Sequence, residues 1–255
     1  MNFFTGIRVY SQAAEILFSR KFWWFMLFPV LVLLILIIGG NILTSYAGDS
    51  LYGLMEAKIA SWVSGISWLQ WVTTTTNILI KIVLKLLYFF LFVAFGGYII
   101  LIVMSPVFSW LSERTEAHLT GKEYPFCLRQ FVREIVRGIL IAIRNMFFQL
   151  LVSLILFLFS FIPIVGFLSP IAIFFSSAYF YGFAFMDYAI ERKLYQVKQS
   201  VRYVNRNFGL VTGIGTVFAL CLMIPWFSLI VCSFVSLLAV IAATIAVNRI
   251  DTSKK

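Results

Sequence analysis

The side chains best suited to bind a ligand are Arg20 and Lys21, which stand just before the first long apolar run. A guanidinium and an ammonium group side by side can hold an oxyanion through charge-assisted hydrogen bonds. The same two groups can instead rest on lipid phosphates, because basic residues gather at the cytoplasmic ends of membrane-spanning segments. The sequence leaves both interpretations open, an anion site and a membrane anchor.

A second set of charged residues lies at the predicted ends of apolar segments. Isolated charges close to a membrane are costly, so they tend to pair or to line a polar cavity. We expect this set to form a salt-bridged hub that holds the segments together. A polar entry path for an anion is the alternative, against which the acidic members argue. The members are Glu113, Glu116, Arg144, Asp187 and Arg206.

Two asparagines, Asn145 and Asn207, each follow an arginine and open a long stretch without charged residues. An asparagine oxygen can accept a hydrogen bond from a free backbone N–H group at the start of a helix. An anion held at a helix N-terminus is the alternative use of such a position. We expect both residues to be helix caps.

The sequence contains no pattern typical of catalysis. His118 is the only histidine, and neither an HExxH motif nor a glycine-rich phosphate loop occurs. The three cysteines form no CxxC pair. The net charge of +10 comes without a nucleic-acid-binding motif. We therefore expect no enzyme activity, no cofactor, no metal site and no nucleic-acid partner.

Composition places these residues in a membrane protein. The chain has 255 residues, of which 62% are hydrophobic and 12% are charged, about half the charged fraction of a soluble domain. Hydrocarbon offers no partners for backbone polar groups, so spanning segments must be helices or closed barrels. Unbroken apolar runs at Phe22–Gly39 and Leu86–Val107 exclude the alternation of barrel strands. The sequence predicts an all-α integral membrane protein.

Two charge-free stretches, 145–186 and 207–248, share one pattern. The spacing from Arg144 to Pro163 equals the spacing from Arg206 to Pro225. Proline lacks an N–H group and disfavours helix in the residue before it. We interpret each stretch as a helical hairpin with a proline at its tip. Whether the hairpins span the bilayer or stop partway stays open, but each returns to the side that it left.

Charged residues divide the single membrane domain into elements. The basic segment 112–144 is assigned to the cytoplasm by the positive-inside rule, which places both termini there. The first residues of the chain are amphipathic enough to lie in the interface. The expected elements are an interfacial helix over 1–18, a transmembrane helix over 22–46, an extracytoplasmic loop over 47–76, a second transmembrane helix over 77–111, the cytoplasmic segment 112–144, hairpins over 145–186 and 207–248, a cytoplasmic helix over 187–206 and a tail over 249–255.

Several landmarks resemble the CysZ-type sulfate permease family, part of a wider group named for an etoposide-induced membrane protein. The resemblance implies two long transmembrane helices with two half-penetrating hairpins, assembled into homo-oligomers in a bacterial inner membrane. It also implies uptake of an inorganic anion such as sulfate. The landmarks are Ser105-Pro106, Glu116-Ala117, Leu119-Thr120-Gly121, Asp187-Tyr188, Phe208-Gly209 and Ile224-Pro225.

One departure from that family concerns the anion site. Sulfate-handling members carry a Gly followed closely by two Arg before a proline that matches Pro29, and the Arg pair falls here on Trp23 and Trp24. The nearest basic residues are Arg20 and Lys21, about one helical turn earlier. The alternative to transport is therefore a membrane scaffold whose basic cytoplasmic face binds anionic lipid headgroups or partner proteins. Since no ATP site occurs, transport would be passive or would need a partner.

Overall fold

The computed structural model describes residues 2–19, 21–63, 82, 97–121, 127–162, 165–191, 197–224 and 227–252. The regular structure in these ranges is helical throughout and includes no strand. Four of the described helices are long and apolar enough to cross a membrane. The prediction of an all-α integral membrane protein is confirmed.

The chain forms two compact units, of which the smaller is Leu31–Gly96. It contains most of helix α2, which runs from Leu27 to Val63. The helix continues past residue 46, the predicted end of the first span, into the predicted extracytoplasmic segment 47–76. Leucine, methionine, glutamate and alanine are frequent in residues 51–60, and no proline interrupts them, so the helix continues.

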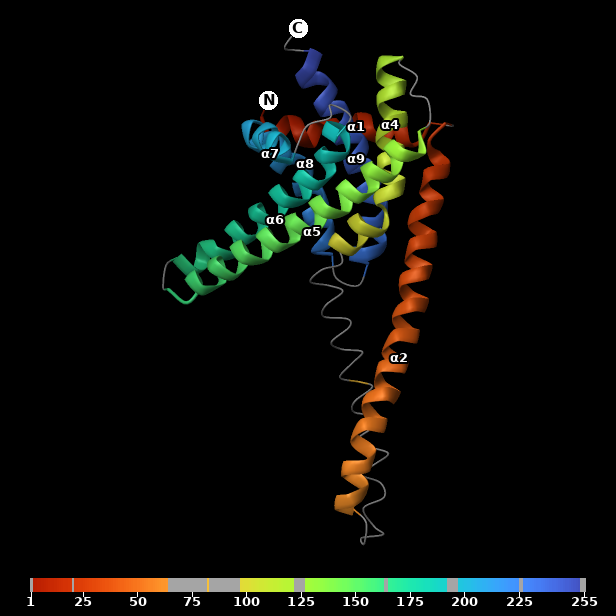
Figure 1. Ribbon diagram of the computed structural model, residues 1–255. Coiled ribbons are helices and arrows are strands. Elements are labelled where there is room, and N and C mark those ends of the chain that lie inside the picture. The colour runs from red at the N-terminus through yellow and green to blue at the C-terminus, as the bar shows by residue number, and fades with distance from the viewer. Residues whose placement is uncertain are drawn as a thin grey trace. The chain divides into compact units, whose positions relative to one another are not determined.

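The larger unit comprises Met1–Val30 and Gly97–Lys255 and contains the remaining helices (Figure 1). Helix α8 packs against α1, α6 and α9, while α4 packs against α5, α6 and α9. The elements are α1 (Phe3–Leu17), the 3₁₀ helix η1 (Trp23–Met26), helical residues 97–103, α4 (Ser105–Thr120), α5 (Leu128–Phe159), α6 (Val165–Ile190), α7 (Val197–Arg206), α8 (Phe208–Leu222) and α9 (Ser228–Thr252).

Glycines let α8 approach its neighbours closely. A Cβ atom added at Gly213 would lie 2.2 Å from the carbonyl oxygen of Phe3, and one at Gly215 would lie 1.8 Å from that of Ala178. Neither distance leaves room for a side chain, so the backbones of α1 and α6 touch α8 directly. This close contact fixes the position of α1, whose end leads into the candidate site.

The second predicted transmembrane helix, 77–111, does not continue to its predicted end. Most of 77–96 lies outside the described residues, but the helix over 97–103 stops at Met104 and α4 begins at Ser105. Pro106 has no N–H group to donate to the preceding turn, which explains the interruption. The predicted polar segment 112–144 is also mostly helical, because α4 continues to Thr120 and α5 begins at Leu128.

The described contacts define the register of the two hairpins. Helix α5 ends at Phe159 and α6 begins at Val165, while α8 ends at Leu222 and α9 begins at Ser228. The predicted tips, Pro163 and Pro225, lie outside the described residues, but contacts on either side of them are symmetric. Gln149 donates to Ser177 at 2.9 Å, and these two residues are equally far from position 163 in the sequence. Cys232 donates to the carbonyl of Phe218 at 3.9 Å, and these two are equally far from position 225.

Candidate functional site

A cavity of about 650 Å³ lies between the end of α4 and the segment that joins α1 to η1. Its polar groups come from three basic or titratable residues, and its remaining walls are mainly aromatic. None of its described lining residues is acidic. The lining consists of Lys21, Phe22, Trp24, Phe25, Arg114, Ala117, His118 and Gly121.

Local hydrogen bonds place Lys21 at this cavity. Helix α1 ends at Leu17, and the hydroxyl of Ser19 then donates to the carbonyl of Ile16 at 2.7 Å. The carbonyl of Ser19 accepts the backbone N–H of Phe22 at 3.0 Å. The indole of Trp24 donates to the carbonyl of Lys21 at 3.1 Å. The backbone that carries Lys21 is thus held in a tight turn.

Aromatic rings anchor the turn to α4. Phe25 is 1% exposed, and its ring centroid lies 5.2 Å from that of Trp110 on α4. Trp24 lies 4.8 Å from Trp110, and Phe22 lies 5.8 Å from the imidazole of His118. Edge-to-face ring pairs of this kind stabilise a structure beyond the area that they bury. They keep Lys21 beside the last turns of α4.

One face of α4 supplies the opposite wall. Arg114, Ala117, His118 and Gly121 occupy positions i, i+3, i+4 and i+7 and therefore share a helix face. Gly121 ends the helix with φ of +70°, and its N–H donates to the carbonyl of Ala117 at 2.9 Å. Such a left-handed end suits glycine, which has no Cβ to clash. The end of α4 thus brings Arg114 and His118 to the cavity.

The electrostatics of the cavity favour an anion. The C-terminal end of a helix carries partial negative charge, so α4 itself attracts cations there. The positive field must therefore come from the two side-chain cations, Lys21 and Arg114. Arg20, the other predicted anion ligand, lies outside the described residues. Trp23 and Trp24 differ in role, since Trp23 is 57% exposed and Trp24 packs in the aromatic cluster.

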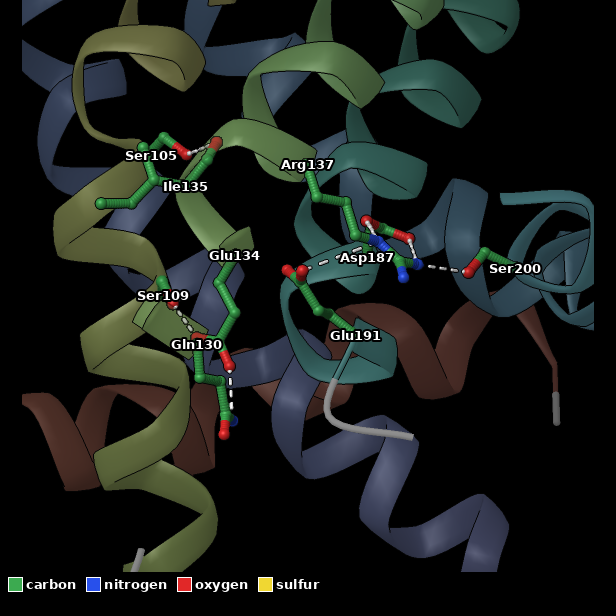
Figure 2. Close-up of polar contacts among 9 residues, drawn as sticks. All are labelled: Ser105, Ser109, Gln130, Glu134, Ile135, Arg137, Asp187, Glu191 and Ser200. Atoms are coloured by element: carbon green, nitrogen blue, oxygen red, sulfur yellow. Dashed lines mark hydrogen bonds and ion pairs between the residues drawn. The ribbon is translucent and has the colours of Figure 1, made fainter. Parts of the chain in front are cut away.

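A separate polar cluster joins α5, α6 and α7 (Figure 2). The guanidinium of Arg137 donates to both carboxylate oxygens of Asp187, at 3.1 Å each, and to the hydroxyl of Ser200 at 2.7 Å. A carboxylate oxygen of Glu191 lies 3.9 Å from Arg137. Asp187 is 2% exposed, so this is a buried, bidentate ion pair.

The predicted hub contains one member of this cluster, Asp187, and lacks its main partner, Arg137. Arg144 lies further along α5, where its guanidinium rests on the rings of Phe148 and Phe183, at 5.0 and 5.6 Å. Glu113 and Glu116 are half-buried on α4, and Arg206 is exposed at the end of α7. A hub that gathers all five remains a prediction.

A signal for Arg137 was present in the sequence. Arg137 precedes Ile162 by the same number of positions as Asp187 follows it. In an antiparallel hairpin, residues equally far from the turn face each other. The proline tip therefore selects Arg137, from among several arginines, as the partner of the acidic residue that follows the first charge-free stretch.

A third set of polar side chains ties α4 to α5 (Figure 2). Glu134 is 5% exposed, and its carboxylate accepts hydrogen bonds from Ser109 at 2.5 Å and Gln130 at 2.9 Å. The hydroxyl of Ser105 donates to the carbonyl of Ile135 at 3.4 Å. The sequence prediction missed Glu134, because a glutamate in a basic segment gives no sign of burial.

The structure contradicts the expected cap at Asn145. This residue lies inside α5, is fully buried and donates from its side-chain amide to the carbonyl of Phe180 at 3.3 Å. It therefore joins the two arms of the hairpin. Asn207 does occupy the N-cap position of α8, but its side chain donates to the carbonyl of Tyr203 at 2.9 Å and makes no capping bond.

Comparison with known families agrees with this architecture. Among the described residues, no group of His, Cys, Asp and Glu is arranged to hold a metal ion. A model of the family described as "Sulfate transporter CysZ/Etoposide-induced protein 2.4" matches residues 9–233. The match covers most of the chain and includes all the described residues that line the cavity, Lys21 among them.

Proposed function

Because the chain belongs to the sulfate transporter CysZ/etoposide-induced protein 2.4 family, we propose that it transports sulfate-like anions across a membrane. The observation that carries the proposal is the cavity in which Lys21 and Arg114 supply two cations and no described lining residue is acidic. In this proposal the family's arginine pair is replaced by a site built from two elements, the turn before η1 and the end of α4.

The chemistry of the cavity suits a hydrated oxyanion. Its volume falls within the range of small-molecule sites. Lys21 and Arg114 donate charge-assisted hydrogen bonds, and the rings of Phe22 and Trp24 exclude part of the water that would screen them. His118 adds a hydrogen-bond donor on the cavity wall. The proposal keeps the predicted topology, with both termini in the cytoplasm of a bacterial inner membrane.

The competing function is a scaffold that binds lipid headgroups without transport. The scaffold predicts that the cations before the first span face outward. Lys21 lines the cavity and is also exposed, so its position is compatible with both functions. The two functions differ in whether anions cross a bilayer.

Sulfate uptake into liposomes holding the purified full-length protein tests the proposal. We expect uptake above that of empty liposomes, and a fall of about tenfold or more in Arg114→Gln, since a hydrogen bond to a charged group contributes about 1.5–3 kcal/mol. Arg202→Gln, which removes an exposed arginine outside the cavity, is the matched control and should transport like the parent. Uptake no faster than in empty liposomes would refute transport, and equal loss in both variants would refute the site.

A further inference from the structure

A second cationic groove lies on α5, apart from the cavity beside Lys21. Its volume is about 390 Å³. The α5 residues that line it recur at helical spacing and so form one stripe along the helix, over about 16 Å at ~1.5 Å per residue. The lining consists of Arg133, Val136, Arg137, Leu140, Ile141 and Arg144 from α5 and Val197 from α7.

Two of the three arginines have a positive charge that can attract an anionic ligand to the groove. Arg137 is neutralised by the buried carboxylate of Asp187. Arg133 is exposed and Arg144 is half-buried, and neither makes an ion pair with a carboxylate in the described part of the chain. The groove therefore has a cation at each end, with Arg144 stacked on aromatic rings and Arg133 exposed, and an aliphatic floor formed by Val136, Leu140 and Ile141 between them.

The groove lies where α5 changes from charged to apolar. Arg144 is the last charged residue before the stretch 145–186, and beyond it α5 continues with exposed apolar side chains. At ~1.5 Å per residue the charge-free part of α5 extends about 22 Å further. A charged boundary followed by exposed apolar residues is the arrangement expected at the level of lipid headgroups. The exposed apolar residues include Phe147, Phe148, Leu151, Ile155 and Leu158.

We propose that this groove binds an anionic phospholipid. The lipid phosphate lies beside the guanidinium of Arg133, and an acyl chain runs along Leu140, past Arg144, toward Leu151. A guanidinium matches the geometry of phosphate oxygens. The aliphatic floor contacts the acyl chain of a lipid, which a free inorganic anion lacks. The cationic part and the aliphatic part of the groove thus both favour an anionic lipid.

Native mass spectrometry of the full-length protein in detergent, titrated with phosphatidylglycerol or phosphatidylcholine, tests this proposal. We expect tighter binding of phosphatidylglycerol, weakened about fivefold in Arg133→Gln, because each basic residue near a lipid surface contributes about that factor. Arg8→Gln, an exposed arginine on α1, is the matched control and should bind like the parent. Equal affinity for both lipids, or equal binding by Arg133→Gln and Arg8→Gln, would overturn the proposal.

The variant Leu140→Ser separates a lipid from a free anion. Leu140 is 61% exposed, so the substitution leaves the core intact. It should weaken phosphatidylglycerol binding, and millimolar inorganic phosphate should not displace the lipid. An unaltered affinity in Leu140→Ser, or displacement by phosphate, would instead indicate a simple anion site.

Discussion

Helices α5 and α6 form one hairpin of the larger unit and α8 and α9 form another, and the two differ in their surroundings. In the most apolar 18-residue stretch of α9, 72% of the residues are buried, whereas in the corresponding stretch of α5 only 17% are. Figure 1 shows α8 and α9 within the bundle, while α5 and α6 run side by side and extend beyond it near the end of α5. The second hairpin is buried over most of its length, whereas the first is buried mainly in the second half of α6 and exposes most of α5.

Side-chain size explains the difference. The second hairpin offers small residues where helices cross, including Gly213 and Gly215 on α8 and Ala242, Ala243 and Ala246 on α9, which let backbones approach. The first hairpin carries phenylalanine and leucine on its outer face, and these bulky side chains stay exposed. Close packing therefore holds α8, α9 and the buried half of α6, whereas interhelical polar contacts, such as Arg137–Asp187 and Gln149–Ser177, join α5 to α6.

Breaking the ion pair should have the largest effect on the first hairpin. Asp187→Ala leaves the buried guanidinium of Arg137 without its main partner, which costs about 3–5 kcal/mol in the free energy of unfolding. Thermal unfolding in detergent measures this. The double variant Arg137→Met with Asp187→Leu should recover most of the loss. An unchanged melting temperature in Asp187→Ala would show that the pair does not hold the hairpin.

Filling the close contact between α6 and α8 should disrupt the packing of the second hairpin on the first. In Gly215→Ala the new Cβ would lie 1.8 Å from the carbonyl oxygen of Ala178, so α6 and α8 must separate. We expect a loss of about 3 kcal/mol in unfolding free energy. Gly39→Ala is the control, because nothing lies within 4 Å of a Cβ there. A similar melting temperature in both variants would contradict the backbone contact.

Truncating one aliphatic side chain in each hairpin compares their burial directly. Ile241 on α9 is fully buried, and Ile241→Ala should cost about 2–3 kcal/mol through the cavity that it leaves. Leu154 on α5 is 56% exposed, and Leu154→Ala should cost under about 0.5 kcal/mol. The two variants are measured by the same detergent melting curves. Equal losses would mean that the two hairpins do not differ in burial.

Removing the two interhelical hydrogen bonds of Gln149 should have a smaller effect than breaking the ion pair or the core packing. Gln149 donates to Ser177 and accepts from the hydroxyl of Tyr98. Gln149→Leu should lower the unfolding free energy by about 1 kcal/mol, since such bonds contribute modestly within membranes. Hydrogen exchange at α5 and α6 reports the local change. Faster exchange confined to α8 and α9 would contradict the assignment of this contact to the first hairpin.

The class of the fold could be predicted well from the sequence, but which helices are buried could not. Hydrophobicity and charge gaps predicted membrane helices, and the matched prolines contained the register that pairs Arg137 with Asp187. They gave no indication that α9 is buried in the helical bundle and α5 is exposed, because Leu154 and Ile241 both stand in apolar runs. Burial is decided by contacts between distant segments, such as Gly215 with Ala178, that local pattern does not carry.

The candidate site was predicted only in part for the same reason. Lys21 was singled out from its position before the first apolar run. Arg114 and His118 were not, since they reach the cavity through the packing of Phe25 on Trp110, a contact between residues far apart in the sequence. Asn145 was assigned to a helix start because charges ended there, although α5 begins well before it, at Leu128.

Equilibrium dialysis of radiolabelled sulfate against the purified full-length protein tests most directly whether an anion binds between Lys21 and Arg114. Saturable binding in the parent protein, weakened about tenfold or more in Arg114→Gln and in Lys21→Gln but not in Arg202→Gln, is the expected result. Binding that is absent, or that is equally strong in all three variants, would contradict the site.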